Sequence, residues 1–298
     1  MVISRHVRLP GFIEVELGSF CNRRCGWCPN AFSERGQRRN EMADATWAAL
    51  LDDLHRARFA GWFAFHNYNE PLADPRLLER VEQARARLPK AKLELHTNGD
   101  FLDRAMLDAL VQRGVELIRV TLYPSNEKAF DPPEPHRARR FLARLGLGDT
   151  QRESRKRSKL ELTTRVAHTE LVVRVPEIDR YTTRAGNAPM PGLKETARRT
   201  ERCLLPFHSA AIDYLGNLKL CCHIFDTSST DAKPYVLGNV ARTPFSALWS
   251  GERMSALRRQ LMRADFSGLD ACAGCAHVTP EHIERAAAPL VRQLEREE

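Results

Sequence analysis

Residues 12–28 read FIEVELGSFCNRRCGWC, a short apolar strand followed by a polar loop with three cysteines. Cys21, Cys25 and Cys28 are spaced as CxxxCxxC. Three thiolates that converge from one loop suit an iron–sulfur cluster, because soft sulfur ligands favour such clusters and a loop can wrap around one corner of the cube. Zinc is the alternative, but a zinc site needs a fourth ligand close by. The nearest downstream histidine, His55, lies on a predicted helix, so the loop favours an iron–sulfur site.

Strands and helices alternate downstream of this loop. The sequence predicts helices over residues 44–58, 74–87, 103–112 and 136–145, and strands over residues 12–17, 62–65, 93–97, 117–122, 160–166 and 171–175. Such alternation is typical of parallel βαβ units, in which ligands gather at the carboxyl ends of the strands. Only residues 167–170 separate the last two strands, a gap too short for a crossover helix. The barrel is therefore expected to close imperfectly, or its fifth strand to bend.

Composition and charge exclude several classes of protein. A chain of 298 residues with 43% hydrophobic residues is neither disordered nor fibrous. Its apolar runs are shorter than the roughly 20 residues that span a bilayer, and residues 1–16 lack the apolar stretch of a signal peptide, so we expect a cytoplasmic protein.

The formal charge is +8, and residues 137–159 hold nine basic residues against two acidic ones. We interpret this basic segment as a solvated helix face and loop.

The CxxxCxxC loop after a first strand resembles the radical S-adenosylmethionine (SAM) superfamily. In that superfamily three cysteines hold a [4Fe–4S] cluster, and the open fourth iron binds the amino and carboxylate groups of SAM. One electron then cleaves SAM to methionine and a 5′-deoxyadenosyl radical, which abstracts hydrogen from an unactivated carbon. The resemblance implies that Cys21, Cys25 and Cys28 hold this cluster, and that a flavodoxin or ferredoxin supplies the electron.

Two further segments resemble SAM-binding motifs of this superfamily. Residues 66–72 read HNYNEPL and are similar to the second-strand motif GGEP, although both glycines are replaced. This similarity implies that Glu70, together with Asn69, holds the SAM ammonium group. The alternative for Glu70 is a carboxylate that stabilises the N-terminus of the following helix. The turn Thr97-Asn98-Gly99 is similar to one that approaches the SAM ribose or methionine, which makes Asn98 a further candidate.

Thr163 and Arg165, on the predicted fifth strand, are candidates for binding the SAM carboxylate. A guanidinium group binds a carboxylate in a two-pronged fork. The alternative, that both residues face outward from an edge strand, is about equally compatible with the sequence.

The C-terminal cysteines follow a second pattern. Cys203 is followed by twelve residues, Gly216, four residues and Cys221, which resembles the start of the SPASM and twitch extensions that carry auxiliary iron–sulfur clusters. Cys272 and Cys275 complete a set of four thiolates, enough to saturate one auxiliary cluster, expected to be [4Fe–4S]. The resemblance therefore implies the twitch type, although a zinc ribbon uses similar spacing.

The resulting prediction is an α/β fold with a partial (β/α)6 barrel over residues 1–185. A linker over residues 186–202 is expected to lead into a small cluster-binding twitch domain over residues 203–298. This domain is predicted to contain a β-hairpin, with Gly216 at its turn, and a helix over residues 244–261.

Cys222 and Arg184 are candidate catalytic residues. Neighbouring residues on a strand point to opposite faces, so Cys221 and Cys222 are not expected to face the same cluster. A spare thiol at Cys222 could donate a hydrogen atom to a substrate radical, the step that an epimerase needs, but a small buried residue packed under the following helix is the simpler interpretation. Arg184 lies in a segment, YTTRAGN, that resembles the exit from the barrel in relatives, which implies a position near the substrate.

Three functions remain as hypotheses. The first is hydrogen abstraction from a small polar natural-product intermediate (an aminocyclitol, sugar or nucleoside), giving dehydrogenation or epimerisation. The cysteine spacing resembles the aminocyclitol dehydrogenases of the butirosin antibiotic pathway, in which the auxiliary cluster would accept the substrate electron. The second is modification of a peptide, although the 20 residues before Cys21 leave no room for a leader-binding domain. The third is a zinc-containing nucleic-acid-binding protein, but no recognition motif accompanies the basic segment, so nucleic acid is not an expected partner.

Overall fold

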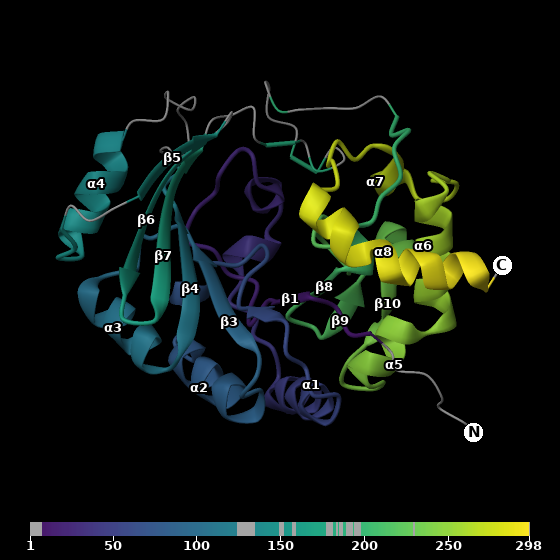
Figure 1. Cartoon of the computed structure of the whole chain (residues 1–298), viewed down its shortest axis with the longest axis horizontal. Coiled ribbons are helices and arrows are strands. Elements are labelled where there is room, and N and C mark those ends of the chain that lie inside the picture. The colour runs from purple at the N-terminus through teal and green to yellow at the C-terminus, as the bar shows by residue number, and fades with distance from the viewer. Residues whose placement is uncertain are drawn as a thin grey trace.

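The computed structural model describes residues 8–123, 135–148, 152–156, 159–176, 198–228 and 230–297, together with residues 181, 182, 184, 187, 188 and 193. Its strands form one sheet in the order β10-β9-β8-β1-β2-β3-β4-β7-β6-β5 (Figure 1). The strands are β1 (Phe12–Val15), β2 (Trp62–Ala64), β3 (Lys92–Thr97), β4 (Val115–Thr121), β5 (Arg152–Lys156), β6 (Lys159–Val166), β7 (Thr169–Pro176), β8 (Ser209–Ile212), β9 (Asn217–Lys219) and β10 (Val236–Asn239).

Helices connect these strands and cover the C-terminal part. The α-helices are α1 (Asp44–Arg56), α2 (Leu77–Arg87), α3 (Arg104–Gln112), α4 (Pro135–Arg144), α5 (Phe245–Ser250), α6 (Glu252–Met262), α7 (Asp270–Ala273) and α8 (Glu281–Arg296). Short 3₁₀ helices are η1 (Pro29–Phe32), η2 (Arg35–Gln37), η3 (Pro71–Ala73), η5 (Leu205–Phe207) and η6 (Thr230–Tyr235). Within the residues described, no helix is both long and apolar enough to cross a membrane.

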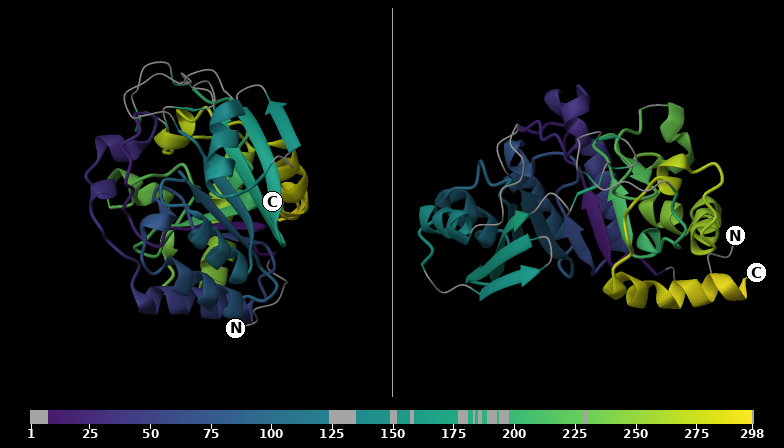
Figure 2. Two further views of the ribbon diagram at one scale, coloured as in Figure 1. Left: turned by 90° about the vertical axis from the view of Figure 1, so that its left-hand side faces the viewer. Right: turned by 90° about the horizontal axis from the view of Figure 1, so that it is seen from above.

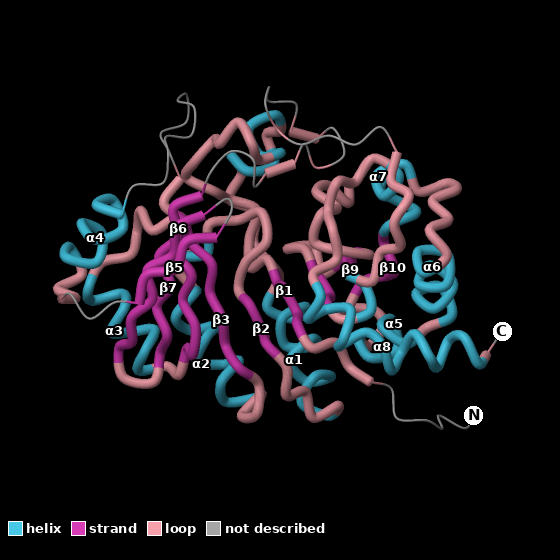
Figure 3. Tube along the Cα trace, turned by 45° about the horizontal axis from the view of Figure 1, so that its top comes forward, coloured by secondary structure: helices cyan, strands magenta, loops and turns pink. Residues whose placement is uncertain are grey.

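The centre of the sheet is parallel. Strands β8, β1, β2, β3, β4 and β7 all run in the same direction, so their carboxyl ends meet at one edge. Apolar side chains such as Leu93, Leu95 and Ile118 are fully buried between the sheet and the helices. Strands β3, β4, β7 and β6 lie side by side in the tube view (Figure 3). The predicted α/β fold with parallel βαβ units is confirmed.

The strand that was expected fifth runs the other way. β6 and β7 form an antiparallel hairpin, and β7, not β6, pairs in parallel with β4. The turn between them is too short for a crossover, so the chain must reverse, and Ala167 adopts a φ of 52° there.

The basic segment over residues 137–159 is also more than a helix face and loop, because its residues 152–156 form the edge strand β5. Arg152 on this strand is exposed, and charged residues on an edge strand discourage pairing with another chain.

The C-terminal hairpin continues the barrel sheet. β8 pairs in parallel with β1 and antiparallel with β9, and Gly216 supplies the left-handed turn with a φ of 85°. The helix predicted over residues 244–261 is instead two helices, α5 and α6, separated at the extended residue Gly251. Seen from above, β5 to β7 and helix α8 lie at opposite ends of the molecule (Figure 2). Most of the predicted linker, residues 186–202, lies outside the described residues.

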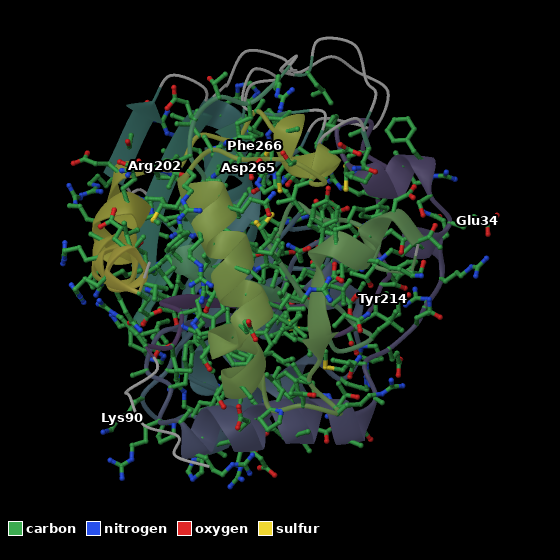
Figure 4. The ribbon with its side chains drawn as sticks, turned by 90° about the vertical axis from the view of Figure 1, so that its right-hand side faces the viewer. Glu34, Lys90, Arg202, Tyr214, Asp265 and Phe266 are labelled. Atoms are coloured by element: carbon green, nitrogen blue, oxygen red, sulfur yellow. The ribbon has the colours of Figure 1, made fainter. Side chains whose placement is uncertain are left out.

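The two ends of the parallel strands are marked by labelled side chains in Figure 4. Lys90 lies in the loop before β3, at the amino ends of the strands, near the bottom of that view. Asp265 and Phe266, which follow α6, lie toward the other end. This second end carries the cysteine loops described below.

Replacing the buried Phe63 on β2 with Ala should lower the free energy of unfolding by about 3–5 kcal/mol, because the change leaves a cavity between α1 and the sheet. The Phe63 ring lies 5.9 Å from that of Trp47 and 5.4 Å from that of Phe65. The exposed Phe101 provides the control, and Phe101→Ala should change the unfolding midpoint little. Equal midpoints for the two variants in anaerobic urea titrations would contradict this core.

Candidate active site

The CxxxCxxC loop lies at the carboxyl end of β1. Cys21, Cys25 and Cys28 line one pocket of about 260 Å³. The loop is held by backbone bonds, with the Cys21 N–H donating to the Gly36 carbonyl (3.0 Å) and the Cys28 N–H to that of Cys25 (2.8 Å). Three thiols therefore face one space from a single loop, as the spacing predicts.

Side chains tie this loop to the turn that follows β3. Arg23 donates from Nη2 and Nε to the two carboxylate oxygens of Asp100 (2.5 and 2.7 Å), a two-pronged ion pair. Asn98 donates from Nδ2 to Oδ1 of Asn22 (2.8 Å). The Thr-Asn-Gly turn thus fixes the shape of the cysteine loop as well as lining the pocket beside it.

Burial determines the protonation of these thiols. Loss of solvent raises the pKa of Cys21 and of Cys25 to about 12 and also raises the pKa of Cys28. A metal that binds here must displace these protons, because the thiolate is the form that binds a metal. A set of soft sulfur donors around a space large enough for several atoms fits an iron–sulfur cluster.

Glu70 lies in the same pocket and is only 3% exposed. Its Oε1 accepts hydrogen bonds from Thr97 Oγ1 (2.6 Å) and the Leu72 N–H (3.1 Å), and its Oε2 accepts one from the Asn98 N–H (2.8 Å). Burial raises the pKa of Glu70 to about 7, although these hydrogen bonds oppose the rise. Glu70 also stabilises a helix N-terminus, as the alternative interpretation proposed, because its side chain caps the 3₁₀ helix η3. A buried carboxylate in a pocket is stabilised by a cationic ligand, so an ammonium group suits this position.

The other predicted SAM residues divide into two groups. Asn69 and Asn98 line the pocket with Glu70 and the three cysteines. Thr163 and Arg165 do not line it. Because β6 is antiparallel to β7, Arg165 pairs with Glu170 near the amino ends of the parallel strands and is exposed. The predicted placement of Thr163 and Arg165 at the ligand end of the sheet is therefore wrong.

Three aromatic rings complete one wall. The ring centroid of Trp27, between the second and third cysteines, lies 5.6 Å from that of Tyr123 and 6.0 Å from that of Tyr181. All three residues line the pocket. Such a surface can stack against a purine ring. No sequence motif marks Tyr123, and only its position two residues after β4 could have identified it.

The segment that replaces GGEP makes contacts that glycine could not make. The Tyr68 hydroxyl donates to the His223 carbonyl (3.2 Å), and Asn67 donates from Nδ2 to Glu14 (2.9 Å) and to the Cys222 carbonyl (3.3 Å). The fully buried Lys219 on β9 donates to Oδ1 of Asn67 (2.7 Å). This segment therefore attaches the C-terminal hairpin to the barrel.

The second set of cysteines gathers around a separate cavity. Its lining includes Cys203, Cys221, Cys272 and Cys275. Burial raises the pKa of Cys272 to about 12 and that of Cys221 well above its usual value. Their soft donors, too, fit an iron–sulfur cluster. In the part of the chain described, no three Cys, His, Asp or Glu side chains lie close enough together to hold a single metal ion.

Arg184 and Cys222 lie between the two sites. Cys221 lines the second cavity and Cys222 lines the active-site pocket, so the two neighbours face different spaces as expected. Cys222 is therefore more than a packing residue under α5 and α6. Arg184 lines both cavities, and its Nη1 forms a hydrogen bond with Nδ1 of His223 (3.1 Å). The Arg184 side chain thus borders both the pocket and the four-cysteine site.

Comparisons with known proteins agree with this geometry. Residues 15–145 match the model of the radical SAM superfamily, and residues 203–276 match SPASM, an iron–sulfur cluster-binding domain. The chain is 26% identical over 278 residues to the S-adenosyl-L-methionine-dependent 2-deoxy-scyllo-inosamine dehydrogenase of Niallia circulans, with 93% of this chain and 97% of the relative covered.

Solved structures give the same result. The crystal structure of BtrN in complex with AdoMet and 2-DOIA matches with a TM-score of 0.68 and 26% identity, over 91% of this chain and 94% of that one. BtrN in an open conformation matches in fold with a TM-score of 0.62, 23% identity and the same coverage. With both cysteine sites in place, the chain contains a radical SAM domain over residues 15–145 and a SPASM iron–sulfur cluster-binding domain over residues 203–276.

Proposed function

We propose that this protein is a radical SAM dehydrogenase that oxidises a secondary alcohol of an aminocyclitol. The observation that carries the proposal is the pocket itself, in which the cluster cysteines and Glu70 share one lining with Glu14, Arg184 and Cys222. The four-cysteine cavity lies directly behind Arg184. The relative from Niallia circulans is named for 2-deoxy-scyllo-inosamine, an aminocyclitol, and supports this substrate class.

Each cofactor has its own residues. Cys21, Cys25 and Cys28 would hold the first cluster, and Glu70 would bind the SAM ammonium, assisted by Asn69 and Asn98. Cys203, Cys221, Cys272 and Cys275 would hold the auxiliary cluster. When bound, these groups supply a carbon radical that removes a hydrogen atom and a nearby acceptor for one electron. An electron donor such as flavodoxin or ferredoxin would reduce the first cluster.

The charges in the pocket favour a substrate with an amino group. Glu14 projects from β1, lines the pocket, and is held through Oε2 by Asn67, which Lys219 fixes in turn. A substrate ammonium would pair with this carboxylate. An uncharged sugar or nucleoside would leave Glu14 desolvated without a cation, which costs free energy. Arg184 offers hydrogen-bond donors to the hydroxyl oxygens.

Cys222 favours epimerisation as a second candidate. Its thiol lines the pocket, and burial raises its pKa well above the usual value, so the sulfur keeps the hydrogen that such a reaction needs.

Incubating the reduced, reconstituted enzyme with SAM and 2-deoxy-scyllo-inosamine distinguishes dehydrogenation from epimerisation. A product that has lost two hydrogen atoms indicates dehydrogenation, whereas a product whose mass is unchanged in ordinary water and which gains one deuterium in deuterated water indicates epimerisation. A substrate that remains unaltered would contradict both reactions.

Cys25→Ala should abolish formation of 5′-deoxyadenosine, because one corner of the cluster loses its ligand. Phe32→Ala, at an exposed position beside the same loop, is the matched control and should retain SAM cleavage. Chromatography of reduced reaction mixtures measures the nucleoside. A normal rate in the Cys25 variant would exclude the assigned cluster site.

Glu70→Gln should weaken SAM binding about 10- to 100-fold, since a hydrogen bond to a charged group contributes about 1.5–3 kcal/mol. The pKa of Glu70 near 7 adds a pH dependence, because protonation removes the charge that attracts the ammonium. The affinity of the unaltered protein should fall as the pH drops below 7, while that of the Gln variant should not. Calorimetric titration measures both, with Glu34→Gln, at an exposed side chain that does not line the pocket, as the control (Figure 4). Equal affinities for the Glu70 and Glu34 variants would remove Glu70 from the site.

Replacing Cys272 and Cys275 together with Ala should lower the iron content to about half, because one of two clusters loses two ligands. The folded variant should still cleave SAM slowly without substrate, while substrate turnover collapses. Circular dichroism controls for unfolding, since metal binding also contributes folding energy. Full product formation by a folded variant would show that the second site is neither an electron acceptor nor part of the substrate site.

A further inference from the structure

We propose that His66, with His96 stacked against it, accepts the proton that the substrate hydroxyl loses during oxidation; this inference rests on the proposed dehydrogenase function. His66 follows β2, His96 lies on the neighbouring strand β3, and both line the active-site pocket. Their ring centroids are 3.7 Å apart and their planes differ by 15°. No motif of the superfamily accounts for this pair.

The oxidation must release a proton inside the pocket. When a secondary alcohol becomes a ketone, its C–H and O–H bonds break, a C=O double bond forms, and one hydrogen atom, one electron and one proton leave. SAM and the cluster held by Cys21, Cys25 and Cys28 would supply the radical that takes the hydrogen atom, and a cluster held by the four C-terminal cysteines would accept the electron. The remaining proton needs an acceptor within hydrogen-bond reach of the substrate oxygen.

Most titratable groups in the pocket are unsuited to this role. Glu70 already accepts three hydrogen bonds, beside the cluster cysteines. The Arg184 guanidinium is a cation with no acceptor atom, so it cannot take up a proton. Burial raises the pKa of Tyr68, Tyr123 and Cys222, so these groups keep their protons. Of the carboxylates and imidazoles that line the pocket, Glu14 and the two histidines remain.

A carboxylate lies beside each ring of the pair. Its Nε2 lies 3.4 Å from Oε1 of Glu14, too far for a strong hydrogen bond but close enough for the carboxylate to stabilise an imidazolium. His96 Nε2 bonds to Oε1 of Glu94 (2.5 Å), which also accepts from Nε of Arg119 (2.6 Å). Burial and the adjacent His66 lower the pKa of His96 to about 3. Two stacked imidazolium rings would repel each other, so the pair holds a single proton.

The charged groups that face this pair come from several strands. Glu14 lies on β1, Glu94 on β3, Arg119 on β4 and Arg174 on β7, and Cys222 approaches Glu14 from the C-terminal part. The two carboxylates flank the two rings, one at each side. The two arginines approach from the side of His96, whereas the Glu14 carboxylate lies against His66.

The test follows hydrogen transfer and ketone formation separately. Ring-deuterated 2-deoxy-scyllo-inosamine is incubated with SAM and the reduced enzyme, its His66→Gln variant, or the control His55→Gln. His55 lies on the exposed surface of α1, where its Nδ1 contacts the Arg87 carbonyl. The His66 variant should transfer deuterium to 5′-deoxyadenosine at nearly the normal rate. Its yield of ketone per 5′-deoxyadenosine should fall at least about tenfold, because a positioned base typically contributes about 100-fold or more.

The pH profile separates a base from a shape-determining residue. Ketone formation by the unaltered enzyme should rise with pH and level off, whereas in the His66 variant it should keep rising because hydroxide replaces the base. His96→Gln removes a ring that disfavours a charge on His66. The pH at which ketone formation levels off should therefore be higher in this variant. An unshifted profile in this variant would contradict the proposed coupling.

Three results would overturn the inference. Normal ketone yield and pH profile in the His66 variant would remove His66 from proton transfer and leave the dehydrogenase function intact. Loss of deuterium transfer together with ketone would show that His66 only shapes the pocket. If the unaltered enzyme transfers no deuterium and forms no ketone, the proposed function fails first, whatever the histidines do.

Discussion

The position of β1 in the sheet determines the rest of the molecule. β1 pairs in parallel with β2 on one side and with β8 on the other, although β8 comes much later in the chain. The cysteine loop at its carboxyl end therefore lies between the second-strand motif and the C-terminal hairpin. Glu16, fully buried just after β1, strengthens this arrangement by accepting from the Tyr68 N–H (2.8 Å) and pairing with Arg35. Without the β1–β8 pairing, the two cysteine sites would have no fixed separation.

The replaced glycines show how the protein combines two parts in one site. Glycines in a motif leave a ligand close to the backbone, whereas Tyr68 fills this space and bonds to the C-terminal part. Lys219 reaches Asn67 from the hairpin, and Asn67 in turn holds Glu14. A side chain of the auxiliary region thus fixes a residue of the active-site pocket. The same hairpin places Cys221 in one cavity and Cys222 in the other.

Much of the fold and of both metal sites could be predicted from sequence, because ligand spacing and strand–helix alternation are local signals. The direction of β6 could not, since a short turn excludes a crossover helix without saying which strand joins the sheet. That error misplaced Thr163 and Arg165. The stacking of His66 on His96 depends on the register between β2 and β3, and no local pattern encodes it. Gly251 interrupts the helix predicted over residues 244–261, and an isolated glycine does not by itself mark a helix end in a sequence.

The central claim is that the chain holds two iron–sulfur clusters of which one alone is open to SAM. Electron paramagnetic resonance of the reduced, reconstituted protein tests it most directly, because a ligand bound to cluster iron alters that cluster's spectrum. The account predicts two overlapping cluster signals, with SAM changing the signal that depends on Cys21, Cys25 and Cys28 and leaving unchanged the signal that depends on Cys203, Cys221, Cys272 and Cys275. A single cluster signal with zinc bound at the four-cysteine site, or two signals that SAM leaves unchanged, would contradict it.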